Sequence, residues 1–158
     1  MSAVAGALAT SSGAATRFTL SSSAFRNGGA MPAVYSCDGK DVSPPLRWTA
    51  TPRAARSLAL RVVDTDAGFT HWTAWGISPR SHGLASGQRP PKQGRNDFSR
   101  VGYGGPCPPS GTHHYVFVLY ALARPLSIAA GASSSRFAST LRAAHVLAQA
   151  KLVGTYRR

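Results

Sequence analysis

Three apolar runs constrain the fold of this chain more than any other feature of its sequence. They are Ser57–Asp64 (SLALRVVD), Trp72–Ser78 (WTAWGIS) and His114–Ala123 (HYVFVLYALA), and a weaker run covers Arg17–Ser22. Runs of this length and composition, bounded by turn-forming Gly and Pro residues, are typical of strands. Because the three are nearly continuously apolar, they predict strands buried on both faces, in the interior of a sheet.

Helical periodicity appears only near the C-terminus. Between Ser133 and Gln149 the apolar residues recur at spacings of three and four, and Ser133–Ser135 can cap the start of a helix. These apolar residues are Phe137, Leu141, Ala144, Val146 and Leu147. A last short strand is expected at Lys151–Tyr156. The sequence therefore predicts one mostly β domain over residues 17–158, with a C-terminal helix.

The first sixteen residues are small and uncharged, mainly Ala, Gly, Ser and Thr. They lack the basic start and the solid apolar centre of a secretory signal, so we predict a disordered tail. No part of the chain approaches the roughly 18 consecutive apolar residues of a membrane helix, so no transmembrane segment is predicted. We expect a cytoplasmic protein, with a secreted or periplasmic location as the alternative if the Ala/Ser-rich segment is the remnant of a signal.

The charge of the chain is strongly positive. It has 18 Lys and Arg against five Asp and no Glu, for a net charge of +13. Such a field attracts phosphates, anionic lipid surfaces and nucleic acid alike, and it does not specify a fold. The basic residues are scattered singly, without a run of five or six like charges, so we predict no specific nucleic-acid partner.

Polar residues lie where the apolar runs end or begin. Asp64 ends the first run, Asp66 follows it, and His71 directly precedes the second. A carboxylate at the end of a buried strand can face a binding site, but it can also cap its own loop in an Asx turn. We expect the Asx turn for Asp66, and both interpretations stay open for Asp64. Taken alone, His71 is better explained as a buried core histidine.

A Gly- and Pro-rich loop precedes the third run. Gly104–Pro109 reads GGPCPP and leads through Gly111 into His113, His114 and Tyr115. The prolines restrict the backbone to a rigid loop, in which N–H groups can point at an anion. Because side chains alternate along a strand, His113 and Tyr115 share one face and His114 takes the other.

The chain has no recognisable catalytic motif. The patterns GxSxG, HExxH and GxxxxGK[ST] are absent, and the spacing of His71, His82, His113 and His114 does not indicate zinc. We therefore expect neither an enzyme nor a cofactor or metal. The alternative is a phosphoester-acting or other hydrolytic enzyme, with Asp64 and either His71 or His113 as the acid/base pair.

Cys37 and Cys107 are too far apart in sequence for a CxxC motif. They are either two thiols or one disulfide, and the residues alone leave this open. A disulfide would favour an oxidising compartment.

Eight fragments, in this order and spacing, resemble the phosphatidylethanolamine-binding protein family, and most closely its bacterial Raf-kinase-inhibitor-like branch. The resemblance covers about Phe18 to Tyr156. The family's usual DPDAP stretch reads DTDAG here, so the rim of the site should be less rigid. The fragments are Met31-Pro32, Cys37–Gly39, Ser43–Trp48, Asp64–Ala67, His71-Trp72, Gly94–Asp97, Gly105–Pro109 and His113–Tyr115.

This resemblance implies a central antiparallel sheet, a second smaller sheet and a C-terminal helix. It also implies that Cys37 and Cys107 lie near each other, at one end of the domain. The implied function is a non-catalytic module that binds a phosphate-like anion or a phospholipid headgroup, and that acts as a kinase- or protease-inhibitor-like regulator. Specific protein partners do not carry over. By motif position the ligand-binding residues would be Asp64, His71, Gly105, Pro106, Pro108, His113 and Tyr115.

A carboxylate in an anion site repels its ligand unless a proton is shared between them. We therefore expect the bound state to hold more protons than the free state. The affinity for the anion should then fall as the pH rises through neutral.

Overall fold

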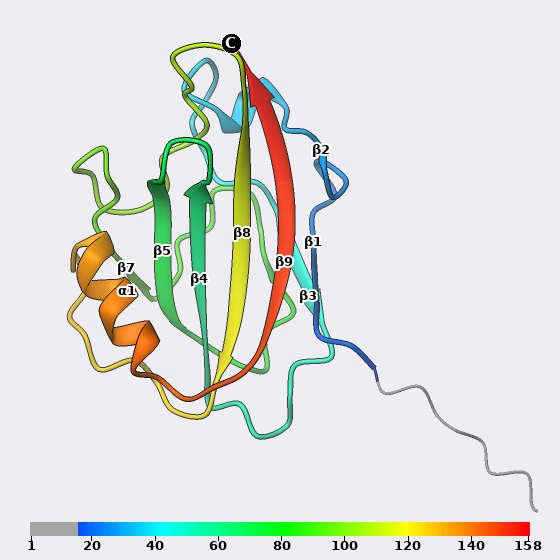
Figure 1. Cartoon of the computed structure of the whole chain (residues 1–158). Helices are drawn as coiled ribbons and strands as arrows, with labels where there is room; N and C mark the ends of the chain where they lie inside the picture. Colours follow the sequence, from blue (N-terminus) through cyan, green and yellow to red (C-terminus); the bar gives the residue numbers. More distant parts are fainter. Residues whose placement is uncertain (1–15) are drawn as a thin grey trace, which may run out of the picture.

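The computed structural model describes residues 16–158, so the tail predicted for residues 1–16 lies outside the described residues except for Thr16. Two sheets form the domain (Figure 1). The larger has the strand order β2 (Gly29–Ala30), β9 (Val146–Arg157), β8 (Thr112–Leu122), β4 (Ser57–Asp64), β5 (Phe69–Ile77) and β7 (Lys92–Gln93). The smaller has the order β1 (Thr19–Ser21), β3 (Leu46–Thr49) and β6 (Gly83–Leu84). This architecture confirms the predicted fold class.

The neighbouring strands of the larger sheet are antiparallel, except for the short parallel pair of β2 and β9. The main core includes Trp48 from the smaller sheet and Leu60 and Phe117 from the larger, all fully buried. A second cluster packs Phe137 and Leu141 of helix α1 (Ser134–Arg142) against Trp75 of β5. The larger sheet is therefore the middle layer, with the smaller sheet on one face and α1 on part of the other.

Burial on both faces is confirmed for two of the three apolar runs. Nearly all residues of β4 and β5 are buried, and β5 begins at Phe69, so His71 lies inside the strand. The prediction is wrong for β8, where buried residues alternate with half-buried ones. Helix α1 packs on β5, and Figure 1 shows no helix over β8 and β9. One face of β8 is therefore left partly open to solvent.

The predicted helix from Ser133 to Gln149 is correct only in its first half. Ser133 caps α1 by accepting the Arg136 N–H at 3.2 Å, as its position suggested, but the helix ends at Arg142. From Val146 the chain pairs with β8 in a long antiparallel ladder. The backbone hydrogen bonds of that ladder outweigh the local helical periodicity. No helix among residues 16–158 is long and apolar enough to span a membrane.

Candidate functional site

Four of the predicted site residues lie together at one end of the larger sheet. Asp64 is the last residue of β4 and pairs in register with Tyr115 of β8. His113, two residues before Tyr115, shares its face, as predicted from the alternation of a strand. His71 comes from β5, and its ring is 5.1 Å from that of Tyr115. We call Asp64, His71, His113 and Tyr115 the buried cluster.

Asp64 is the hydrogen-bonding centre of the cluster. Its Oδ2 lies 2.6 Å from His113 Nδ1, and its Oδ1 accepts the backbone N–H groups of Asp66 (3.0 Å) and Ala67 (3.1 Å). The Asx-turn interpretation of this residue is therefore correct, and its other oxygen faces the cluster, while its role in binding stays a prediction. Its side chain is 5% exposed and that of His113 is 17% exposed. His113 is thus the member of this pair that reaches solvent.

Asp66 pairs with the next residue of β8. Its Oδ2 accepts the backbone N–H of His114 at 2.6 Å and lies 2.9 Å from His114 Nδ1. The hydrogen bonds from His114 hold the pKa of Asp66 below its usual value. The Asx turn predicted for Asp66 is wrong, because the β4–β8 register brings His114 within reach of its carboxylate.

His71 is held by the loop that precedes β8. Its Nδ1 lies 2.7 Å from the carbonyl oxygen of Gly104, and since a carbonyl can only accept, Nδ1 carries a hydrogen. Burial lowers the pKa of His71 below its usual value. The ring is therefore neutral at neutral pH, and Nε2 is left as an acceptor. The rings of Phe69 and Phe98 also stand edge-on to it.

The Tyr115 hydroxyl is fully buried and has no hydrogen-bond partner within normal geometry. Burial, and then the nearby Asp64 carboxylate, raise the pKa of Tyr115 well above its usual value. The hydroxyl is therefore protonated, and the Asp64 carboxylate and the Cys107 backbone are the polar groups nearest to it. Buried polar groups are nearly always paired in folded proteins, so this hydroxyl could donate a hydrogen bond to a ligand.

The loop around Gly105 forms a wall beside the cluster. The Gly104 N–H donates to the His71 carbonyl at 2.9 Å, and the Gly105 N–H donates to Asp41 Oδ1 at 2.6 Å. The Gly105 N–H is therefore engaged within the protein, and Pro106 and Pro108 have no N–H to offer. A ligand-binding role for the backbone from Gly105 to Pro108 stays a prediction. Residue 105 must be glycine, because a Cβ there would collide with the Tyr35 carbonyl.

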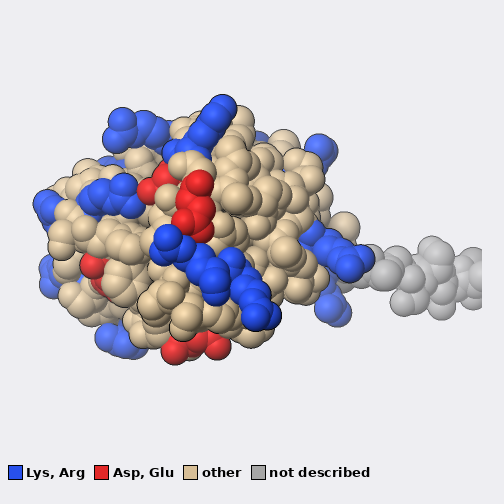
Figure 2. All heavy atoms as spheres, turned by 90° about the horizontal axis from the view of Figure 1, so that it is seen from above, with Lys and Arg blue, Asp and Glu red and all other residues tan. Residues whose placement is uncertain are grey.

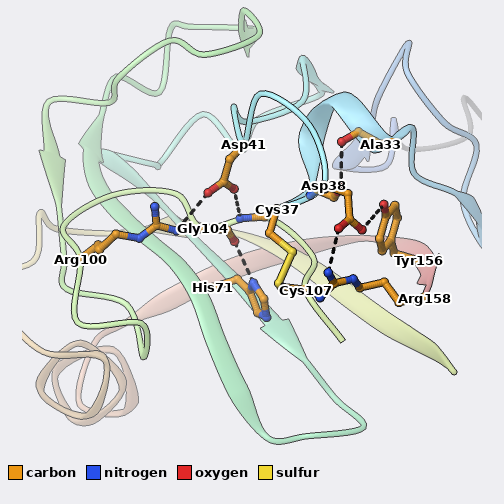
Figure 3. The surroundings of a disulfide bond; sticks show 12 residues. Ala33, Cys37, Asp38, Asp41, His71, Arg100, Gly104, Cys107, Tyr156 and Arg158 are labelled. Atoms are coloured by element: carbon orange, nitrogen blue, oxygen red, sulfur yellow. Dashed lines mark hydrogen bonds and ion pairs between the residues drawn. A yellow bond between two sulfur atoms is a disulfide. The ribbon is translucent and has the colours of Figure 1, made fainter. Parts of the chain in front are cut away.

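A disulfide joins this loop to the segment after the 3-10 helix η1 (Ala33–Tyr35) (Figure 3). The Cα atoms of Cys37 and Cys107 are 5.4 Å apart, which confirms the closeness implied by the family resemblance. The Cys37 N–H also donates to the Pro106 carbonyl at 3.1 Å. In Figure 3 the ring of His71 points at Gly104, close to the disulfide. The wall is therefore fixed by one covalent bond and several hydrogen bonds.

Comparison with known proteins agrees with this architecture. A sequence model of the family described as phosphatidylethanolamine-binding protein matches residues 21–157. The chain belongs to that family. A UPF0098 protein of Methanothermobacter thermautotrophicus is 45% identical over 149 residues, which are 88% of this chain and 98% of the relative. A Mycobacterium tuberculosis relative, named "Putative lipoprotein LppC", is 42% identical over 90% of this chain and 74% of its own.

A crystal structure of Escherichia coli YbcL, described as a new member of the mammalian family of these proteins, has a TM-score of 0.83 to this chain. The two are 29% identical, and the match covers 90% of this chain and 99% of YbcL. The fold of a phosphatidylethanolamine-binding protein is thus shared over nearly the whole described domain.

The sequence did not predict that Asp41 helps to hold the loop around Gly105 in place. Besides the Gly105 N–H, it contacts the Arg100 guanidinium at 3.0 Å. Its backbone has a φ of 55°, a conformation that Asp adopts more readily than most residues. Its place between Cys37 and Ser43 was visible in the sequence, but its partners are about 60 residues away along the chain. A local pattern gives no signal for such a contact.

A groove of about 200 Å³, lined in part by Asp41 and Tyr103, borders the wall but includes none of the four cluster residues. The His113 side chain is more exposed than that of Asp64, so a ligand of the buried cluster would reach the pair over His113. Figure 2 looks onto the end of the molecule that carries the C-terminus, and acidic side chains lie near the middle of that view with Lys and Arg around them. The net positive charge is thus not a continuous basic patch on this face.

Oxygen and nitrogen atoms of Asp64, Asp66 and His113 lie within 4.8 Å of one another, so within residues 16–158 they form a group that could hold a metal ion. In this arrangement they are already paired by hydrogen bonds. A cation between Asp64 and His113 would have to replace the Nδ1 proton. The absence of a required metal stays a prediction.

Proposed function

We propose that this protein binds a small phosphate-like anion, such as a phospholipid headgroup, at the buried cluster without transforming it. The observation that carries the proposal is the Tyr115 hydroxyl, a buried and protonated donor that makes no hydrogen bond of normal geometry although it lies near the Asp64 carboxylate. It lies in the same cluster as His113, whose Nδ1 is held by Asp64 and whose Nε2 remains free for a ligand. A phosphate oxygen would accept from the hydroxyl and, when the His113 ring is protonated, from Nε2 as well.

The carboxylate of Asp64 does not prevent such binding, because three donors surround it. A protonated His113 would donate through Nδ1 to Asp64 and through Nε2 to the anion. His71 is neutral and offers Nε2 as an acceptor, which suits an anion that carries its own proton. Binding therefore takes up or retains protons, and the affinity falls as the pH rises through neutral.

Lack of turnover is also part of the proposal. Both oxygens of Asp64 are engaged, which leaves His113 as the base of a hydrolytic reaction, and the cluster contains no serine or cysteine thiolate to serve as nucleophile. Assays on phosphoesters and peptides should give rates equal to those of a His113→Ala variant. A wild-type rate clearly above that variant would favour the enzyme alternative.

We further propose that anion binding serves a regulatory, inhibitor-like role outside the reducing cytoplasm. The disulfide supports an oxidising compartment, in agreement with the secreted or periplasmic alternative. Trapping of free thiols in intact cells with a maleimide tests this: an exported protein should have both cysteines blocked. Two reactive thiols would restore the cytoplasmic expectation.

Calorimetry with O-phosphoethanolamine and with inorganic phosphate tests the binding proposal. Tyr115→Phe should raise the Kd by about tenfold, the effect of losing one hydrogen bond to a charged group. Tyr120→Phe, in the same strand but on the other face, is the matched control and should leave the Kd unchanged. Saturable binding that Tyr115→Phe does not weaken would contradict the proposed site.

A further inference from the structure

A groove lies on the opposite face of the larger sheet, at the C-terminal end of α1. It has a volume of about 320 Å³. Arg61 of β4 pairs with Val118 of β8. Arg61 lies three residues before Asp64, and because side chains alternate between the two faces of a strand, it points away from the buried cluster. We call this hollow the α1 groove. Its lining is Arg61, Tyr120, Ala138, Leu141, Arg142, Ala144 and Val146.

Arg61 has no counter-charge. Its Nε is buried without a hydrogen-bond partner, and its recorded hydrogen bond is a long one of 3.5 Å to Thr70 Oγ1. A partly buried guanidinium without a counter-charge is destabilising. The chain has five acidic side chains, and each is engaged elsewhere: Asp38 with Arg158, Asp41 with Arg100, Asp64 with His113, Asp66 with His114, and Asp97 with Ser134.

Arg142 adds a second positive charge to the groove. Its position in the last turn of α1 is favourable for the helix by itself, because cations stabilise the C-terminal end of the helix dipole. Arg61, in the middle of a strand, has no such local reason to be there. The pair therefore favours an anion supplied from outside the chain.

The rest of the groove is mostly apolar. Leu141 is buried at its base, and Val146 is 37% exposed, one of two large apolar side chains exposed in residues 16–158. An exposed apolar side chain next to two arginines suits a ligand with an apolar part as well as a charge. Inorganic phosphate would leave that apolar surface in water, and a neutral lipid would leave Arg61 unpaired.

We propose that the α1 groove binds an amphiphilic carboxylate, with its charged group on Arg61 and Arg142 and its apolar chain against Leu141 and Val146. This site is separate from the buried cluster, and its ligand does not depend on the function proposed above. The two sites use opposite faces of the same two strands, β4 and β8.

Calorimetry with octanoate tests this inference. Acetate, which has the carboxylate but no long apolar chain, and 1-octanol, which has the apolar chain but no charge, are the two control ligands. Octanoate should bind one equivalent, and both controls should bind at least about tenfold more weakly. The proposal would be overturned if acetate bound the wild-type protein as tightly as octanoate does. It would also be overturned if octanoate showed no binding up to about 10 mM, which corresponds to a Kd weaker than the millimolar range.

Variants then locate the site. Arg61→Met should raise the Kd for octanoate by about tenfold, the effect of one charge-assisted hydrogen bond, and Arg142→Met should act in the same direction. Arg53→Met removes one exposed charge elsewhere and is the matched control. Arg142 is exposed on the helix, so Arg142→Met should fold normally. This variant tests the site if Arg61→Met fails to fold. Equal weakening by Arg53→Met would overturn the proposal.

The same titrations separate the two sites. His113→Ala should leave octanoate binding unchanged, and Arg142→Met should leave O-phosphoethanolamine binding unchanged. Loss of octanoate binding in His113→Ala would place that ligand at the buried cluster and overturn the second site.

Discussion

Two Asp–His pairs lie side by side where β4 meets β8, and they differ mainly in burial. Asp64 and His113 are 2.6 Å apart with side chains 5% and 17% exposed, and Asp66 and His114 are 2.9 Å apart with side chains 41% and 52% exposed. The same residue types at nearly the same spacing thus occur once under the wall of the Gly105 loop and once in solvent.

The comparison teaches that the environment, and not the residue pair, makes the candidate site. In water an exposed ion pair contributes little, because the solvent screens it. Under the wall, the Asp64–His113 pair is accompanied by a buried tyrosine hydroxyl that makes no hydrogen bond of normal geometry, and by a neutral histidine. We therefore expect the inner pair to determine both stability and binding, and the outer pair to determine neither.

The largest effect should come from removing the wall's covalent anchor. The disulfide spans 70 residues, and its loss in a Cys37→Ser/Cys107→Ser variant should lower the free energy of unfolding by about 4 kcal/mol. Urea unfolding measures this loss. In NMR spectra of the folded variant, the ring signals of His113 should shift and those of His114 should not. Equal shifts of both would mean that the wall does not distinguish the two pairs.

The next effect separates the two aspartates. Asp64→Ala removes the acceptor of three hydrogen bonds in a buried setting and should cost about 2–4 kcal/mol of unfolding free energy. Asp66→Ala, the matched control, should leave the urea midpoint nearly unchanged. The comparison fails if both variants lose the same stability.

A smaller effect concerns pH. Burial lowers the pKa of His71 in the folded protein, so below about pH 6.5, the usual pKa of histidine, the unfolded chain binds a proton that the folded protein does not. The contribution of His71 to stability is complete above that pH and is lost as the pH falls through the folded pKa. His71→Asn keeps a donor near Gly104 and should flatten the stability profile below about pH 6.5. A wild-type slope in His71→Asn would contradict this account.

Much of this could be predicted from the sequence, and the misses have a common cause. The apolar runs located β4, β5 and β8, and the alternation of a strand placed His113 and Tyr115 on one face. The errors concern long-range pairing: β9 replaces half of the predicted helix because it pairs with β8, and Asp41 takes the Gly105 N–H from far along the chain. Local patterns carry no signal for these contacts.

The most direct test compares the two histidines. Calorimetry with O-phosphoethanolamine near pH 6 and pH 8 should show that His113→Gln raises the Kd by at least about tenfold and that His114→Gln leaves it within about twofold of the wild type. The wild-type affinity should be higher at the lower pH. Equal effects of the two variants, or binding by His113→Gln as tight as that of the wild type, would contradict the assignment of the anion site to the buried cluster.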